Sequence, residues 1–226
     1  MLHKIIQYKT TGTLLAMLEL QLFLGISEVI YIVCDGLHHM DRLSYYWMMF
    51  TILTAKWEAA YMQHRNKVHS ISVDLIKNNQ HVWTNMYTLD HIYPGKFARL
   101  FYGEYGAYAD KEYMSRADIW SALIESTHAL FCGSISTMAC ISGMLYLNTL
   151  NHVLLALAMG GQCMNSILYL GDYYGQVYNK DHINYPSTRF PLGYCLIYRP
   201  FLYINVLWVV MPVYVSGNIL YKLIYI

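Results

Sequence analysis

Two glutamates of this 226-residue chain lie inside apolar segments, where a charged side chain is expensive to place. Glu125 lies about two turns inside the apolar run 119–147, and Glu58 lies near the end of the run 43–63. A carboxylate within a membrane span costs about 2.5–3.5 kcal/mol on insertion scales, so chains keep one where it faces a partner, a cavity or a reaction. A structural role and a chemical role are therefore both open to each of these two glutamates.

Other polar residues are expected at a depth similar to that of the two glutamates. If five spans alternate in direction, four span ends lie on the same side of the membrane: the end of the second, the start of the third, the end of the fourth and the start of the fifth. At about 1.5 Å per residue, Glu58, Glu125, Asn205 and Trp208 then lie roughly 6–11 Å below one surface. The fourth span adds two residues at similar or slightly greater depth, Gln162 and Asn165.

Helical spacing predicts that these side chains share faces. Five residues of the third span are separated by three or four positions: Asp118, Ser121, Glu125, His128 and Cys132. Such spacing puts side chains on one face of a helix. The second and fifth spans carry similar sets: Thr54, Glu58 and Tyr61, and Asn205, Trp208 and Pro212. Polar stripes avoid lipid, so we expect them to surround one site.

Each residue alone also has a structural interpretation. Glu125 is equally well explained as a protonated carboxyl that hydrogen-bonds across helices. Glu58, near Lys56 and the end of a span, by itself favours an interfacial carboxylate over a catalyst. His128 and Trp208 taken singly favour helix packing, and Asn205 favours interhelical hydrogen bonding. The shared depth of these residues is what favours a functional site.

Composition indicates an integral membrane protein. Hydrophobic residues make up 56% of the chain and charged residues 13%, whereas soluble domains are about 25% charged. A net charge of +1, with no stripe of Lys and Arg, argues against nucleic acid as a partner. The five cysteines form no CxxC pair and predict no disulfide or zinc framework. The sequence His38-His39 with Asp41 favours an interfacial loop over a metal site, so no metal is expected.

The apolar runs predict an all-α integral membrane fold, a five-transmembrane-helix bundle in which residues 1–226 form a single membrane domain. The spans are expected at about 12–34, 43–63, 119–147, 150–171 and 201–221. Glu19 interrupts the first run and no small-residue cleavage site follows, which favours a retained helix over a signal peptide. The short turn Asn148-Thr149 predicts an antiparallel hairpin of the third and fourth spans.

A long capping loop separates helices 2 and 3, at about 64–117. It is rich in Tyr and contains the turn signal Tyr93-Pro94-Gly95. A structureless loop of this length is unusual, so we expect short interfacial helices that cover one end of the bundle.

These motifs together resemble the emopamil-binding protein family, the Δ8–Δ7 sterol isomerases of the EXPERA domain group. The resemblance covers roughly residues 50–216, within a core of about 43–222. It is carried by the third-span residues Asp118, Glu125 and Gly133; by Glu58 with Tyr61; by Glu104-Tyr105, Asp110 and Tyr113; by Gly161-Gln162 with Leu168-Tyr169; and by Asn205, Trp208 and Pro212. Two positions depart from the family, because Thr54 stands where it has His and His128 where it has Thr. Arg199-Pro200 also interrupts a usually aromatic approach to the fifth span.

The resemblance implies an isomerase that shifts a C=C bond by protonation and deprotonation through a carbocation, without a cofactor. Glu58 and Glu125 would be the acid/base pair, since burial disfavours a charged carboxyl and keeps the donor protonated. His128 would be a shuttle, Asn205 would orient a carboxyl, and Trp208 would stabilise the cation. The remaining substrate-binding residues would be Thr54, Tyr61, Ser121, Gln162 and Tyr169.

The implied substrate is a sterol or polycyclic terpenoid, with lipophilic amines as inhibitors. The implied location is the endoplasmic reticulum membrane, as a multi-pass protein and a candidate homodimer. Two alternatives stay open: an isomerase of a specialised polycyclic terpenoid pathway, and a non-catalytic protein that binds sterols or cationic amphiphiles. Counting Lys and Arg places the N-terminus and the long loop in the cytosol, whereas the resemblance implies the opposite orientation.

Overall fold

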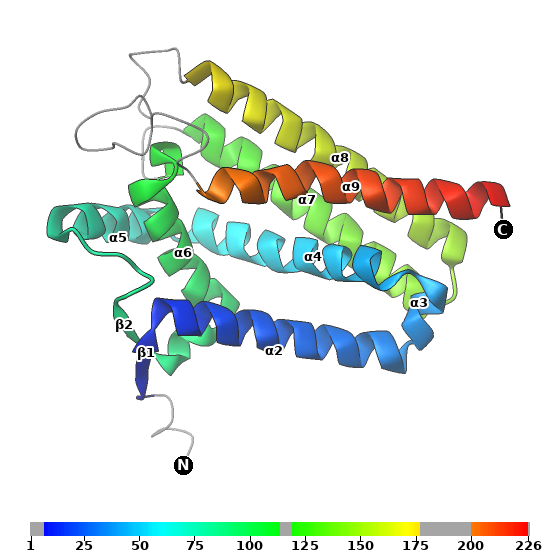
Figure 1. The fold of residues 1–226 in the computed structure, drawn as a ribbon, viewed down its shortest axis with the longest axis horizontal. Helices are drawn as coiled ribbons and strands as arrows, with labels where there is room; N and C mark the ends of the chain where they lie inside the picture. Colours follow the sequence, from blue (N-terminus) through cyan, green and yellow to red (C-terminus); the bar gives the residue numbers. More distant parts are fainter. Residues whose placement is uncertain (1–6, 114–118, 177–199, 226) are drawn as a thin grey trace.

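The computed structural model describes residues 7–113, 119–176 and 200–225. Five long helices run side by side along the longest axis of the molecule, and shorter helices lie at its ends (Figure 1). The long helices are α2 (Gly12–Val33), α4 (Arg42–Gln63), α7 (Ile119–Met144), α8 (Asn148–Gln176) and α9 (Pro200–Tyr225). They lie where the sequence places the five apolar runs.

Three of the described helices are long and apolar enough to cross a membrane: Gly12–Val33, Asn148–Asp172 and Ile204–Tyr225. Their outer faces expose large apolar side chains, among them Leu22 on α2, Val153 on α8 and Leu220 on α9. Extended exposed apolar surface of this kind marks contact with a membrane or another protein. α4 is more polar than these helices and is buried along much of its length, with Tyr45, Met48 and Leu53 in the core.

The long segment between α4 and α7 contains the short helices that its length predicts. It forms α5 (Arg65–Asn78), strand β2 (Met86–Thr88), the 3-10 helix η1 (Leu89–Ile92), α6 (Pro94–Tyr108) and the 3-10 helix η2 (Lys111–Tyr113). Pro94 begins α6, where a proline suits the first helical position. α6 lies across the bundle end opposite the short helix α3 (Asp35–His39), and α5 extends outward from that end (Figure 1).

One small sheet departs from the all-helical prediction. Strand β1 (Lys9–Thr11) pairs antiparallel with β2, with Lys9 opposite Thr88 and Thr11 opposite Met86. Thr11 then accepts a hydrogen bond from the backbone N–H of Leu14 and caps the start of α2. The pairing fixes the start of α2 to the capping segment.

The turn between α7 and α8 differs from its predicted position. Tyr146 has a φ of 63°, and the backbone N–H groups of Tyr146 and Leu147 donate to the carbonyls of Gly143 and Ser142. This is a Schellman closure, which ends α7 before Asn148, so Asn148 begins α8 instead of forming the turn. A left-handed Tyr gives no sequence signal, because Gly and Asn usually occupy such positions.

A close approach of α4 and α7 sets the geometry of the bundle centre. A Cβ atom added at Gly133 would lie 2.1 Å from the Cβ of Ala55, so only glycine permits this contact. Small residues allow helix backbones to pack closely in the same way within membranes. The contact draws together the two helices that carry Glu58 and Glu125.

Candidate functional site

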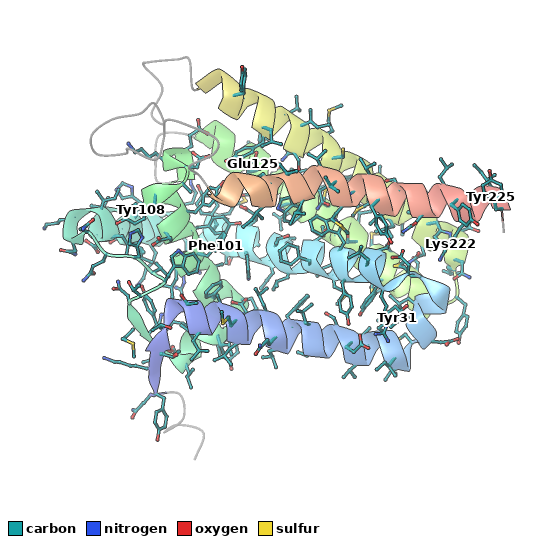
Figure 2. The ribbon with its side chains drawn as sticks, viewed as in Figure 1. Tyr31, Phe101, Tyr108, Glu125, Lys222 and Tyr225 are labelled. Carbon is teal, nitrogen blue, oxygen red and sulfur yellow. The ribbon has the colours of Figure 1, made fainter. Side chains whose placement is uncertain are left out.

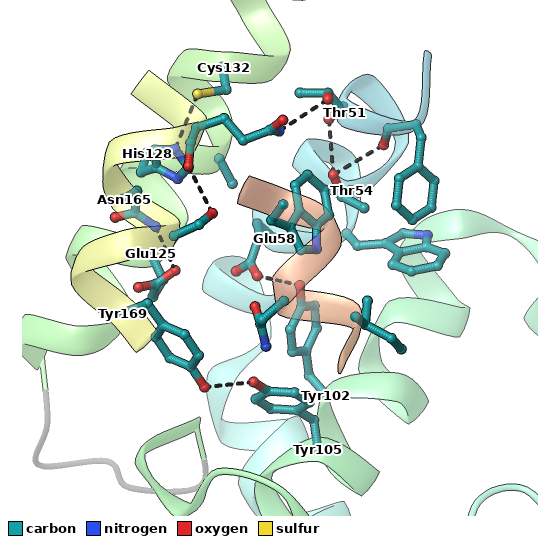
Figure 3. A pocket seen from close by; sticks show the side chains of 18 of the residues that line it. Thr51, Thr54, Glu58, Tyr102, Tyr105, Glu125, His128, Cys132, Asn165 and Tyr169 are labelled. Carbon is teal, nitrogen blue, oxygen red and sulfur yellow. Dashed lines mark hydrogen bonds between the residues drawn. The ribbon is translucent and has the colours of Figure 1, made fainter. Parts of the chain in front are cut away.

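A cavity lies at the α6 end of the bundle, between α4, α6, α7, α8 and α9 (Figure 3). Its volume is about 170 Å³. Eight of the ten predicted site residues line it: Thr54, Glu58, Glu125, His128, Gln162, Tyr169, Asn205 and Trp208. Ligand pockets of drug-sized molecules measure about 300–1,000 Å³, so a ligand of several rings would extend beyond this cavity through its mouth or require side chains to move apart.

Among the predicted residues whose side chains the structure describes, one is not part of the cavity lining. Tyr61 is buried, with 1% of its surface exposed, and its ring packs on Tyr102 with centroids 5.0 Å apart. It lies one turn beyond Glu58, where α6 crosses α4 and covers it, so helical phase alone placed it too near the site. The side chain of Ser121 and the whole of Asp118 lie outside the described residues.

Glu58 is held by hydroxyl donors from two different elements. The Tyr102 hydroxyl of α6 donates to Glu58 Oε1, and the Ser126 hydroxyl of α7 donates to Glu58 Oε2 over 3.3 Å. Burial raises the pKa of Tyr102 well above its ordinary value, so this phenol keeps its proton as a donor. Both oxygens of Glu58 are therefore satisfied while the residue borders the cavity.

Glu125 enters the cavity from the opposite wall. It is half-buried on α7, and its Oε2 accepts a hydrogen bond of 3.3 Å from Asn165 Nδ2 of α8. Among the described residues Glu125 forms no ion pair. Figure 3 shows Glu125 beside Asn165 and Tyr169, with Glu58 across the cavity on α4.

His128 makes a contact that the predicted shuttle role does not include. Its Nε2 lies 3.2 Å from Cys132 Sγ, one turn along α7. In the described part of the chain His128 hydrogen-bonds to neither glutamate. Thr54, at the other departure from the family pattern, donates its hydroxyl to the backbone carbonyls of Phe50 and Thr51 at 3.1 Å each.

Part of the cavity wall is aromatic. The Trp208 ring stacks on Phe50 with centroids 5.6 Å apart and tilts against Trp47 at 4.9 Å. Gln162 accepts from Trp47 Nε1 over 2.7 Å and donates to Thr51 Oγ1 over 3.2 Å. The polar groups here are thus occupied by one another, which leaves ring faces as the surface offered to a ligand.

α6 supplies part of the site that the depth argument did not find. Phe101, Tyr102 and Tyr105 of this helix line the cavity. Tyr105 is three residues from Tyr102 and four from Phe101, the spacing of neighbours on a helix surface, which is a usable signal. Counting depth only along the apolar runs excluded them, because α6 lies in the segment between the second and third runs.

No group of three His, Cys, Asp or Glu side chains within the described ranges could hold a metal ion. No family model, curated protein or solved structure matches the chain. Fold and cavity together define a mostly helical protein with apolar helices of membrane-spanning length and a cavity into which two glutamates project.

Proposed function

We propose that the protein is a membrane isomerase that shifts a C=C bond in a sterol or related polycyclic terpenoid, as the sterol isomerases it resembles do. One observation carries the proposal: Glu58 and Glu125, on different helices, border the same cavity with the aromatic face of Trp208. Such a pair can add a proton at one carbon and remove a proton at another. In this proposal all five long helices cross the membrane of the endoplasmic reticulum, and the protein is a candidate homodimer.

The hydrogen bonds support a division of roles between the two carboxyls. Glu58 accepts two hydroxyl hydrogen bonds, and donors of this kind favour an ionised carboxylate. Glu125 accepts one amide hydrogen bond and forms no ion pair with a described residue. We therefore assign Glu125 as the acid and Glu58 as the base.

In the proposed reaction the Glu125 carboxyl gives its proton to one carbon of the double bond, and the other carbon becomes a cation. Glu58 then removes a proton from a carbon next to the cation, and the electrons of that C–H bond form the new double bond. Glu125 ends ionised and Glu58 ends protonated. One proton must return from Glu58 to Glu125 before the next turnover, and no redox change occurs.

The walls of the cavity suit a cationic intermediate. The face of Trp208 can attract a cation, and its ring is held in place by Phe50 and Trp47. The same features suit protonated lipophilic amines, which carry a positive charge on an apolar body. We expect such amines to inhibit the enzyme.

A second candidate function is binding of sterols or cationic amphiphiles without turnover. The His128 contact with Cys132 favours it, because it leaves the imidazole without a hydrogen bond to either described glutamate. A third version keeps the chemistry and changes the substrate to a specialised polycyclic terpenoid.

Isomerisation in D2O separates these functions. The purified protein in lipid nanodiscs is given a Δ8-sterol, and the product is analysed for deuterium. An isomerase that uses an exchangeable carboxyl proton places one deuterium on the protonated carbon in each turnover. A sterol that returns unshifted and undeuterated would rule out Δ8-sterol isomerisation. Lipid analysis of a strain lacking the protein then distinguishes an unfamiliar accumulated terpenoid from no change, the result expected of a binding protein.

A further inference from the structure

A third glutamate, Glu19 of α2, is buried behind the cavity wall. Glu19 is 3% exposed, whereas Met17 and Leu22 of the same helix are 54% and 56% exposed. α2 therefore turns Glu19 toward the bundle interior, although a carboxyl within a membrane span is costly. No described residue of α2 lines the cavity, so the proposed reaction leaves Glu19 without a role.

The side chain of Glu19 makes a single hydrogen bond within the described part of the chain. Trp57 Nε1 of α4 donates to Glu19 Oε1 over 2.8 Å. The second oxygen, Oε2, is buried and has no hydrogen-bond partner among the described residues. An apolar side chain would fill this position without leaving a buried polar atom unpaired. Packing of α2 on α4 therefore does not account for a glutamate here.

Trp57 connects Glu19 to the site. It lines the cavity, and its ring packs on Phe101 of α6, another lining residue, with centroids 5.3 Å apart. The indole N–H is the only polar group of a tryptophan side chain, and it can only donate. Because Glu19 accepts from this group, Trp57 offers the cavity aromatic carbon alone.

Loss of the acceptor would change what the Trp57 ring presents to a ligand. A buried N–H without an acceptor is unfavourable, so the indole would be driven to turn this group toward the cavity. The positive end of the N–H dipole would then repel a cation, whereas the π surface of an aromatic ring attracts one. The position of the N–H thus decides whether this wall favours or disfavours positive charge.

We propose that Glu19 is a positioning residue that holds the Trp57 N–H away from the cavity, so that this wall attracts a positively charged ligand. Glu19 does not itself touch the ligand. The ligand class is an ammonium group or a carbocation on an apolar polycyclic body. The proposal adds charge selection to the proposed function and rests on it only for the ligand being a cation of this kind.

The test uses binding and requires no turnover. The full-length protein in nanodiscs is titrated with a tertiary amine carried on an alkylated decalin, and with the neutral analogue in which a CH group replaces the nitrogen. The ratio of the two affinities measures charge selection. Glu19→Leu should reduce the wild-type ratio roughly 2–30-fold, the range of one contact between a cation and an aromatic ring. Glu19→Met gives the same comparison if Glu19→Leu does not fold.

Two further variants show whether the effect passes through the indole N–H. Glu19→Gln keeps an oxygen that can accept from Trp57, so it should retain most of the wild-type ratio. Trp57→Phe removes the N–H and keeps an aromatic ring, so adding Glu19→Leu to it should change the ratio no further. A ratio as low in Glu19→Gln as in Glu19→Leu, or additive losses in the double variant, would contradict the positioning role.

Glu28→Leu is the matched control. Glu28 of α2 also accepts a hydrogen bond from α4, donated by the Tyr46 hydroxyl, but Tyr46 does not line the cavity. Its ratio should equal that of the wild-type protein, and an equal fall in both variants would assign Glu19 to helix packing. A wild-type ratio near one, or one that survives Glu19→Leu, would also overturn the proposal. Failure of the deuterium experiment leaves these ratios unaffected, so the proposed function and the positioning role can fail separately.

Discussion

Glu125 and Glu28 lie at opposite ends of the bundle, and they differ in their partners: Glu28 pairs with a cation, whereas Glu125 accepts from a neutral amide. Glu28 of α2 pairs with Arg42 over 3.1 Å and accepts a hydrogen bond from Tyr46, while Arg42 lies over the Tyr31 ring at 5.3 Å. Figure 2 places Tyr31 at the end remote from Glu125. Glu125 has one amide donor and, among the described residues, no cation. A carboxylate neutralised by arginine serves structure, whereas an unneutralised one beside a cavity is available for chemistry.

The largest expected effect is that of Glu125→Gln. The change keeps shape and one hydrogen-bond acceptor but abolishes proton transfer, so turnover should fall about 10²–10⁴-fold, the range of general acid–base catalysis. Thermal stability should barely change. Sterol isomer ratios measured by mass spectrometry, with a melting curve of the same sample, provide both readouts.

Glu28→Gln is the control for that experiment. It breaks an exposed ion pair worth at most about 1 kcal/mol, and turnover should stay within about twofold of wild type. Full activity in Glu125→Gln would show that Glu125 is not needed for proton transfer, and Glu125 and Glu28 would then both have structural roles.

The sequence predicted the helices better than the contacts of the site. Apolar runs longer than a membrane core placed α2, α4 and α9 within a few residues, because burial and lipid exposure both require continuous apolar surface. Depth along those runs also brought Glu58, Glu125 and Trp208 to one cavity. Depth along the apolar runs could not identify hydrogen-bond donors that come from a helix outside those runs.

Tyr102 illustrates the limit. It lies 44 positions from Glu58 in the sequence, and its hydrogen bond depends on how α6 crosses α4. Nothing in the helical period of either segment encodes that crossing. Tyr61 lies outside the lining for the same reason, because Tyr102 of α6 packs on its ring.

The second prediction concerns the only imidazole that lines the cavity among the described residues. If His128 carries a proton between the glutamates, it must leave its contact with Cys132 during turnover. His128→Thr should then lower turnover on the order of 10²-fold, and adding Thr54→His should recover part of it. Cys132→Ala retains the imidazole and should leave turnover near wild type.

A double-mutant cycle on turnover measures the coupling between positions 54 and 128. Purely additive effects, or an active His128→Thr protein, would show that the exchanged Thr and His have no joint function. His128 would then resemble Glu28 in having a structural role, which its contact with Cys132 explains.

The third prediction tests the cationic character of the cavity. A protonated lipophilic amine should bind more tightly than its neutral isostere, and Trp208→Leu should reduce the difference. Cation–π attraction of about 0.5–2 kcal/mol corresponds to roughly 2–30-fold in affinity. Trp83→Leu, at a tryptophan outside the lining, should leave the difference intact. Equal binding of amine and isostere to the wild-type protein would contradict the electrostatic part of the proposal.

The smallest expected effect is at Asp90, a carboxylate that resembles Glu28 in having a cation but lies in the capping segment. Hydrogen bonds from Lys96 and Thr88 hold its pKa well below the ordinary value. A depressed pKa in the folded state means that the stabilisation is complete above the unfolded value of about 4 and is lost as the pH falls below it. Because the Lys96 side chain is 41% exposed, the contribution should be at most about 1 kcal/mol. Melting of the protein in nanodiscs between pH 6 and about pH 3 should therefore show a slightly smaller acid-induced loss in Asp90→Asn than in wild type. Identical pH profiles would mean that the Asp90–Lys96 pair adds nothing to stability, and that a cation beside a carboxylate is not by itself evidence of a stabilising role.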